Sequence, residues 1–575
     1  MNKLFFYKNF FKKHLTQCIL LFILFIFLAI IFLNIPISKI NTQLPEHVDA
    51  YLVSWIWSWE DHILLTDPLN FFNSNIFAPF ENTLAYTEIM LGSFLLAWPI
   101  LIIFNNPILA YSIVVLLTFA ISGLGMYLLI YYLTKNKLAA LLAALIYAFA
   151  PFKLIHSIGH LHLTGMWLPY VFLYLHKFFR IQTWKNILLL TLFVILVFLT
   201  GFHYFIFLPI IILVFFFTYY LSKSFRFNKD NIKKIILSLT ILVLIFTPII
   251  LPFIQLKEEY NFVRSIETIE AYSPDLIDYL IPPVLYNYFY SSRSHMEMVV
   301  GPGLIIGLLF IFSLYYIFKK NQRIKSIQRN KTNFIIYFIT ASIAFIISFG
   351  FYIQFNSTNV GGIATFYSLF YYFIPGFDGI RAVGRYSIFV LLSITVFIGY
   401  GFTIYQQQCK NIFKKNIIYF LIIIFLFIEL SLIPVVSYSE VKVYPNTEEL
   451  FAWIRKQPPE KIFLNIPLGF RLNPEINLDI IHVFNSRLHF KRIVNGYSGQ
   501  RPPNYDNLIY SLNISGPQKS LQLLEEFKVN YLIYYFDFYE NPDEVRDWYI
   551  NQLEQANNIK YVTNFGNNYV YEIVY

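Results

Sequence analysis

Long apolar runs recur along almost the whole of this sequence and restrict the environment in which it can fold. The first, QCILLFILFIFLAIIFL, is about as long as the hydrocarbon core of a bilayer is thick. Hydrophobic residues make up 57% of the chain and charged residues only 13%, whereas roughly a quarter of the residues of a soluble domain are charged. We therefore predict a polytopic α-helical membrane protein with about eleven spans.

The charges of the chain mark the sides of the membrane. Its net charge of +10 comes mostly from Lys and Arg in the short gaps between apolar runs, which is typical of cytoplasmic loops and not of a nucleic-acid partner. Basic residues before the first run predict a cytoplasmic N-terminus. A cleaved signal peptide begins in the same way, but no small-residue cleavage site follows Leu33, so we predict a retained span.

A short apolar run from Leu91 to Phe104 decides the topology of everything after it. It contains Pro99, and if it crossed the bilayer, the basic loop from Lys223 to Lys234 would lie outside. We therefore predict an interfacial helix there. The later spans then alternate, at about 108–133, 138–152, 163–178, 186–201, 203–221, 386–405 and 417–435, with three more ending near 254, 319 and 351.

The C-terminal part of the chain differs in composition from the rest. Residues 1–435 hold the spans and two long external loops, at about 37–107 and 255–300, whereas residues 436–575 contain no span and regain charge. KIFLNIPL and VNYLIYYF are typical of strands, LQLLEEFK of a helix, and YVTNFGNNYVYEIVY of a hairpin with an Asn-Asn turn. We predict a small extracytoplasmic α/β domain.

Acidic and aromatic side chains gather in the first external loop, where the first span leaves the bilayer. The stretch includes HVDAYLVSWIWSWEDHILLTD, in which aromatic residues lie between the acids. Acids placed among aromatic residues at the membrane surface predict the acidic half of an active site for a lipid-linked substrate. These acids are Glu46, Asp49, Glu60, Asp61, Asp67 and Glu88.

Several phrases, in order, resemble the GT-C class of integral membrane glycosyltransferases, in a prokaryotic branch with a C-terminal external domain. They include HVDAYLVSWIWSW, DPLNFFNSNIFAPFENTLAYTEIMLGSFLLAWPI, AFAPFKLIHSIGHLHLTGMWLPYVFLYLHKFF, SPDLIDYLIPP and PGFDGIRAVGRYSIFVLL. The resemblance implies a multi-pass protein of the prokaryotic plasma membrane. It also implies a sugar donor linked through phosphate to a polyprenyl lipid, with transfer on the outer face to a glycan, lipid or protein of the cell envelope.

The same resemblance implies that an acid of the first external loop acts on the acceptor, and Asp49 holds the matching position. General-base assistance by a carboxylate is worth roughly 10²–10⁴-fold in rate. A solvated loop acid is the alternative for Asp49. The helix that follows carries Trp55, Trp57 and Trp59, which we expect to anchor at the membrane interface. Glu46, one turn earlier, binds the acceptor, helps to bind a metal, or faces water.

Fixed positive charge is needed where a phosphate leaves. Arg381 and Arg385 are four residues apart in GIRAVGRY, at the external end of a predicted span. This spacing predicts both guanidiniums on one helix face, and Arg suits bidentate phosphate contacts. The alternatives are an interfacial anchor or an ion pair with Asp378.

Histidines form the next group of candidates. His156, His160 and His162 share one external turn, and His203 lies in the next. We expect His160 and His162 to hydrogen-bond the phosphate or the sugar. A zinc site and ordinary interfacial histidines are the alternatives, and the spacing fits no tight metal motif.

Glu88 and Asp275 are the remaining predicted substrate-binding residues. In similar sequences a histidine follows the position of Glu88, but here Ile89 follows, which leaves an acid–histidine pair at this position open. Asp275, in SPDLIDYLIPP, either caps a helix or contacts the acceptor or a metal. Cofactor use is left open, with a divalent cation as the candidate.

Two other classes of function remain as alternatives. A transporter or flippase of lipid-linked sugars needs broken helices and ionisable groups near mid-membrane, whereas here the acids gather in external loops, with Glu429 as the exception. A non-catalytic membrane scaffold predicts that Asp49→Asn is harmless. The distribution of acids favours an enzyme at the membrane surface.

Overall fold

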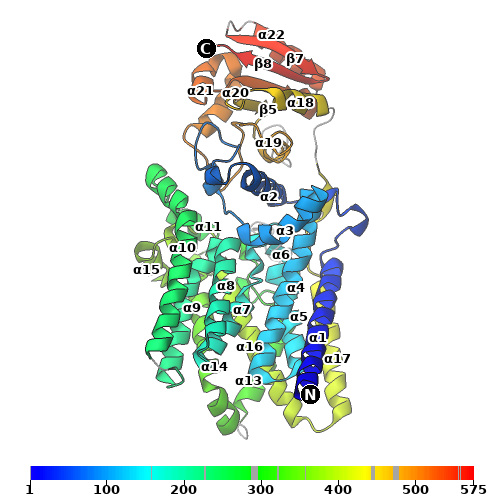
Figure 1. The fold of residues 1–575 in the computed structure, drawn as a ribbon, viewed down its shortest axis with the longest axis vertical. Helices are drawn as coiled ribbons and strands as arrows, with labels where there is room; N and C mark the ends of the chain where they lie inside the picture. Colours follow the sequence, from blue (N-terminus) through cyan, green and yellow to red (C-terminus); the bar gives the residue numbers. More distant parts are fainter. Residues whose placement is uncertain are drawn as a thin grey trace.

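The protein consists of a helical bundle with an α/β domain stacked on one end (Figure 1). The N-terminus lies at the opposite end of the bundle from this C-terminal domain. The structure is a computed structural model, and it describes residues 2–156, 158–225, 228–285, 296–319, 323–355, 358–441, 447–469, 478–539, 541–554, 556 and 558–575.

Every predicted span contains a helix. Among the described residues, the helices of seven spans are long and apolar enough to cross a membrane (those in α1, α4, α5, α9, α10, α14 and α16), while α8 and α13 are apolar but shorter. The number that cross therefore stays a prediction. The bundle helices are α1 (Asn2–Phe32), α4 (Pro107–Thr134), α5 (Lys137–Phe149), α7 (Leu168–Arg180), α8 (Trp184–Thr200), α9 (Phe202–Leu221), α10 (Lys229–Tyr260), α13 (Leu304–Phe318), α14 (Arg323–Ile347), α16 (Ser387–Gln408) and α17 (Ile412–Ser431).

The centre of the bundle is formed by α4, α5 and α16, which are its most buried long helices. Helix α4 packs against α1, α5 and α7, and α16 packs against α13 and α14. By contrast, α1 and α10 bury few of their apolar side chains, as expected for helices that face lipid. The acid Glu429 of α17 accepts hydrogen bonds from the Leu304 and Ile305 amides, so it caps α13.

Two helices of the first external loop lie between the bundle and the C-terminal domain (Figure 1). Helix α3 (Leu91–Phe104) has the predicted bounds and is steeply inclined to the long axis of the molecule. Helix α2 (Val48–Thr66) packs against α3, α4 and helix α19 (Leu478–Ser486) of the C-terminal domain. The prediction that its tryptophans anchor at the membrane is wrong, because Trp55 and Trp57 are completely buried in protein.

The C-terminal domain contains a four-stranded mixed sheet in the order β5-β6-β8-β7. Strand β5 (Phe463–Ile466) is parallel to β6 (Tyr531–Tyr535), while β8 (Asn568–Ile573) is antiparallel to both β6 and β7 (Ile559–Phe565). The β7–β8 hairpin turns at Gly566-Asn567 and not at the expected Asn-Asn pair, because Gly566 adopts the positive φ of +60° that this turn needs. The other helices are α18 (Glu448–Lys456), α20 (Tyr505–Lys519), α21 (Leu521–Glu526) and α22 (Pro542–Glu554).

The first external loop and the C-terminal domain are joined by backbone pairing. Strand β1 (Gln43–Pro45) pairs antiparallel with β4 (Tyr438–Glu440), just after α17. Farther along, the Ala78 amide donates to the Ile493 carbonyl at 3.0 Å, and the Ile493 amide donates to the Asn75 carbonyl at 2.7 Å. The remaining short elements are α6 (Pro151–His156), α11 (Ile266–Ala271), α15 (Tyr367–Phe373) and the β2–β3 hairpin (Tyr352–Phe355, Thr358–Ala364).

Candidate active site

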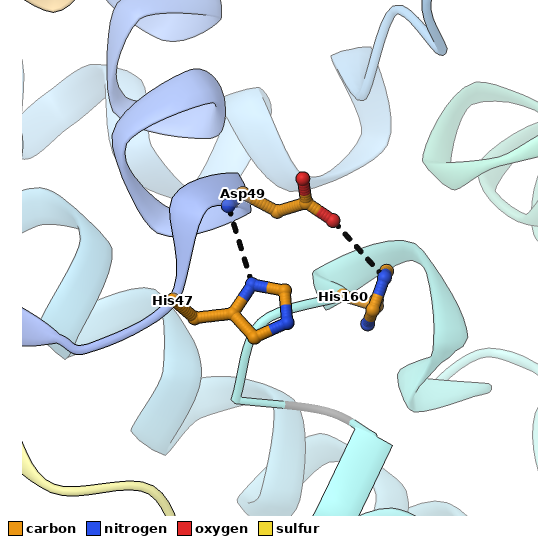
Figure 2. Close-up of side chains that lie close together, drawn as sticks. All are labelled: His47, Asp49 and His160. Carbon is orange, nitrogen blue, oxygen red and sulfur yellow. Dashed lines mark hydrogen bonds and ion pairs between the residues drawn. The ribbon is translucent and has the colours of Figure 1, made fainter. Parts of the chain in front are cut away.

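Asp49 lies in the first turn of α2, where its backbone amide has no partner within the helix. His47 supplies that partner as the N-cap residue: its Nδ1 accepts from the Asp49 amide at 3.2 Å. The Asp49 carboxylate is 3.0 Å from Nε2 of His160, and its other oxygen points away from that ring (Figure 2). The rings of His47 and His160 are edge to face, with centroids 5.0 Å apart.

A glycine makes this arrangement possible. Gly159 precedes His160 in the turn between α6 and the 3₁₀ helix Leu161–Thr164. A Cβ atom at Gly159 would lie 2.5 Å from Nδ1 of His47, closer than carbon and nitrogen can approach. The imidazole that caps α2 therefore packs directly on the backbone of the turn that presents His160 to Asp49.

Glu88 forms a second acid–histidine group beside the first. Its Oε1 is 3.0 Å from Nδ1 of His203, the second residue of α9, and it is also close to His162. A Cβ atom at Gly201 would lie 2.5 Å from Glu88 Oε2 and 2.8 Å from His162 Cβ, so only glycine permits this approach. The histidine partner of Glu88 thus comes from a distant helix and not from the position after it.

Arg385 joins the histidines to a further acid, Glu297. Its Nη1 lies 3.4 Å from His162 Nε2 and 3.3 Å from His203 Nε2. Its Nε donates to the two carboxylate oxygens of Glu297 at 3.2 and 3.0 Å, and Nη2 also donates to Glu297. His156 lies on the other side of Glu297, with Nε2 3.8 Å from the carboxylate. Arg385 is thus fully engaged by protein groups.

One polar cluster therefore runs from Asp49 through the histidines to Arg385. The ring centroids of His160 and His162 are 5.6 Å apart, and those of His162 and His203 are 6.0 Å apart. The imidazoles thus connect the predicted acidic half of the site with one of the two predicted cations.

Electrostatics keeps the two carboxylates of this cluster ionised. Burial alone would raise the pKa of Asp49, but the hydrogen bond from His160 and the positive potential of the neighbouring imidazoles lower it to about 2. Burial would likewise raise the pKa of Glu88, but His162, the hydrogen bond from His203 and the charge of Arg385 lower it to about 2. Burial lowers the pKa of His162 to about 3, so this imidazole is neutral at pH 7.

Other predicted site residues lie outside this cluster. Arg381 and Arg385 do not share a helix face, because α16 begins only at Ser387 and Arg385 lies in a 3₁₀ turn. Arg381 instead stacks on Tyr272, with its guanidinium carbon 4.3 Å from the ring centroid. The alternative ion pair between Arg381 and Asp378 is not found, since the Asp378 carboxylate pairs with Lys257.

Glu46 and Asp275 make local contacts. Glu46 precedes α2, is exposed, and accepts a hydrogen bond from the Ser437 hydroxyl, so it does not share a helix face with Asp49. Asp275 begins the 3₁₀ helix Leu276–Tyr279, where it and Asp278 form a reciprocal capping box. The capping role predicted for Asp275 accounts for this geometry.

The His47, Asp49 and His160 group can hold a divalent cation. Its ligand atoms lie within 4.8 Å of one another, and two imidazoles with a carboxylate suit Zn²⁺ or Mn²⁺. Glu88, His162 and His203 satisfy the same distance criterion, but the Arg385 guanidinium donates toward both of these imidazoles and would repel a cation there. The first group is therefore the better candidate.

Sequence reasoning missed His47 and Glu297. His47 precedes Asp49 by two residues, and its role depends on where α2 begins, which the sequence did not fix. Glu297 is an isolated acid just before an apolar run, and this position at the end of a predicted span was the feature of the sequence that could have marked it as a site residue. Its partner Arg385 is 88 residues away, so only the tertiary fold brings the two together.

Three comparisons place the chain among known proteins. Residues 91–358 match the model of a family described as "6-pyruvoyl-tetrahydropterin synthase related domain; membrane protein". No curated protein matches the sequence. The structure is similar to the arabinofuranosyltransferase AftD from Mycobacteria, with a TM-score of 0.58 at 11% identity, and to the Archaeoglobus fulgidus oligosaccharyltransferase, with a TM-score of 0.52 at 12% identity.

Both of these structures are GT-C glycosyltransferases. The chain has the GT-C fold. The match covers 97% of this chain and 40% of AftD, and 90% of this chain and 69% of the oligosaccharyltransferase. The chain thus spans about two fifths of the length of AftD, and within this GT-C fold the Asp49–Arg385 cluster lies at the end of the bundle that carries the C-terminal domain.

Proposed function

We propose that the protein is a glycosyltransferase that moves a sugar from a polyprenyl-phosphate donor to a hydroxyl acceptor of the cell envelope, on the outer face of the membrane. The observation that carries this proposal is Asp49 at the end of a GT-C bundle, with its ionised carboxylate paired to His160 and its backbone amide capped by His47. The basic N-terminal region lies at the opposite end of the bundle, which supports the outer face as the side of the reaction.

Asp49 is the group that acts on the acceptor. Its carboxylate accepts the hydrogen bond of the attacking hydroxyl and takes the proton as that oxygen becomes more acidic during bond formation. The acceptor oxygen forms a bond to the anomeric carbon while the bond from that carbon to the phosphate oxygen breaks, and the electron pair leaves with the phosphate. This single displacement inverts the anomeric centre. His160 holds the carboxylate in one orientation, so little conformational entropy is lost when the acceptor binds.

Arg381 is the better of the two predicted cations for the leaving phosphate. Arg385 is neutralised by Glu297, whereas neither Arg381 nor Arg264 has an ion pair with a described carboxylate. The Arg381 guanidinium stacks on Tyr272, and Arg264 also interacts electrostatically with that tyrosine. The two guanidiniums repel each other, since burial and the positive charge of Arg381 lower the pKa of Arg264. Two neighbouring uncompensated guanidiniums form a site that an anion stabilises. Arg385 then serves to position His162 and His203.

The proposal is tested with purified protein in lipid nanodiscs, incubated with a panel of polyprenyl-phosphate sugars and cell-envelope lipids. Asp49→Asn should reduce transfer by about 10²–10⁴-fold with normal folding. Asp67→Asn is the matched control, since Asp67 lies at the other end of α2 and bonds only locally to Asn70. Equal transfer by wild type and Asp49→Asn, or no product from any donor, would refute the assignment.

A further inference from the structure

A groove of about 580 Å³ separates the end of α10 from the C-terminal domain. Tyr260 and Phe262 line it on the bundle side. On the other side it is lined by Ser498, Gly499, Gln500, Arg501, Pro503 and Asp506. This volume is in the range that small-molecule sites occupy.

The walls of the groove are fixed by contacts between the two parts of the protein. Arg264 Nη2 donates to the Gly499 carbonyl at 3.0 Å, and the Ser498 hydroxyl donates to the Tyr86 carbonyl at 2.6 Å. Tyr86 in turn contacts Tyr260 through their hydroxyls, 3.4 Å apart. The groove is therefore held open before any ligand arrives, and a preorganised site pays less entropy on binding.

Tyr497 connects this groove with the proposed catalytic carboxylate. It precedes Ser498 in the chain and is close enough to Asp49, Arg381 and Arg501 to interact with each electrostatically. The groove also adjoins the segment that carries Glu88 of the Asp49–Arg385 cluster, since Ser498 of the groove wall donates to the carbonyl of Tyr86, two residues before Glu88.

The chemistry of the walls selects the ligand class. The Tyr260 and Phe262 side chains are half-buried and offer apolar ring surfaces, with the Arg264 guanidinium covering one face of Phe262 at 4.5 Å from the ring centroid. Arg501 and Asp506 form an ion pair that neutralises both charges and places donors and acceptors side by side, and Gln500 adds one of each. A sugar ring matches this set, because it has a C–H face for aromatic contact and adjacent hydroxyls that donate and accept. Residues 498–502 form no strand, so the groove offers an extended peptide no sheet edge there.

We propose that this groove is the acceptor subsite and binds a neutral saccharide, with its ring faces on Tyr260 and Phe262 and its hydroxyls at Gln500, Arg501 and Asp506. The inference rests on the proposed glycosyl transfer and gives the C-terminal domain the task of holding the acceptor. It also makes the acceptor a glycan or glycolipid and not a peptide.

The test measures equilibrium binding in the Asp49→Asn protein, so that it does not depend on transfer. Saturation-transfer NMR with a panel of neutral oligosaccharides identifies a binding probe, and calorimetry gives its affinity. Adding Gln500→Ala should weaken binding about three- to tenfold through the lost hydrogen bonds. Adding Gly499→Phe should abolish it, since the nearest atom to a Cβ there is 3.7 Å away and the ring enters an open groove.

Gln522→Ala is the matched control, because Gln522 is exposed on α21 of the same domain; it should bind the probe like the parent protein. Thermal melting of each variant confirms folding. The inference is overturned if no oligosaccharide binds, if Gln500→Ala and Gly499→Phe bind like the control, or if peptide probes bind and saccharides do not. Saccharide binding without sugar transfer by the wild type would instead refute the proposed function alone.

Discussion

The buried ion pair between Arg385 and Glu297 allows a quantitative test of how the site is held together. Their side chains are only 7% and 8% exposed. Glu297→Gln leaves the guanidinium buried without its counter-ion, and breaking a buried pair from one side costs about 3–5 kcal/mol of unfolding free energy. Replacing both partners by apolar residues of similar size is often nearly neutral. We therefore expect the double variant Glu297→Leu/Arg385→Met to regain most of the stability that Glu297→Gln loses.

The assay is unfolding by SDS in mixed micelles, followed by tryptophan fluorescence. Asp378→Asn is the control, because its partner Lys257 is 45% exposed and such pairs contribute about 1 kcal/mol or less. If the double variant is less stable than Glu297→Gln, the cost of burying an unpaired charge is not the main contribution to stability in this part of the structure. A loss from Glu297→Gln no larger than that of the control would also refute the reasoning.

Three further predictions concern the same end of the bundle. Glu88 has a pKa of about 2 against an ordinary value of 4.5, so about 3 kcal/mol of stability, present above pH 4.5, is lost as the pH falls toward 2; Glu88→Gln should flatten this acid limb of the unfolding curve. Gly159→Ala pushes a methyl group into the imidazole that caps α2 and should lower kcat about tenfold or more. His62 stacks on Phe490 at a centroid distance of 3.9 Å, and a double-mutant cycle of alanine variants should give a coupling of about 0.5–1.5 kcal/mol.

Each of these predictions has its own control or refuting result. If the unfolding free energy of Glu88→Gln falls with decreasing pH as steeply as that of the wild type, other carboxylates cause the acid destabilisation. Gly307→Ala is the control for the glycine, because a Cβ there meets no atom within 4 Å, and it should leave kcat unchanged. A coupling near zero would mean that the stacked pair adds nothing to the attachment of the C-terminal domain.

Hydropathy and charge predicted the helices of the bundle because lipid and water impose them locally. Leu91–Phe104 is an example: the sides assigned to distant basic loops predicted an interfacial helix for this short run with Pro99, and the bounds of α3 agree, while its place at the interface stays a prediction. The tryptophans of α2 were misassigned, since composition alone does not distinguish a ring buried by a C-terminal domain from one in the headgroup region.

The candidate site was predictable residue by residue but not as a set of partners. Asp49 and His160 were both singled out, and the structure pairs them. The pairing of Arg385 with Glu297 was not foreseen, because it joins two loops across the bundle. The helical spacing assumed for Arg381 and Arg385 failed because α16 begins after them, and helix ends are the least certain part of a sequence-based assignment.

The pairing of β1 with β4 has a consequence for biosynthesis. Residues 43–45, directly before the cap of α2, are hydrogen-bonded to residues 438–440, which the ribosome adds almost four hundred residues later. A nascent chain therefore inserts its whole set of bundle helices before the strand that anchors Asp49 can form. Under the proposed function, sugar transfer begins only once translation has passed this point, so a chain stalled in the membrane would consume no donor lipid.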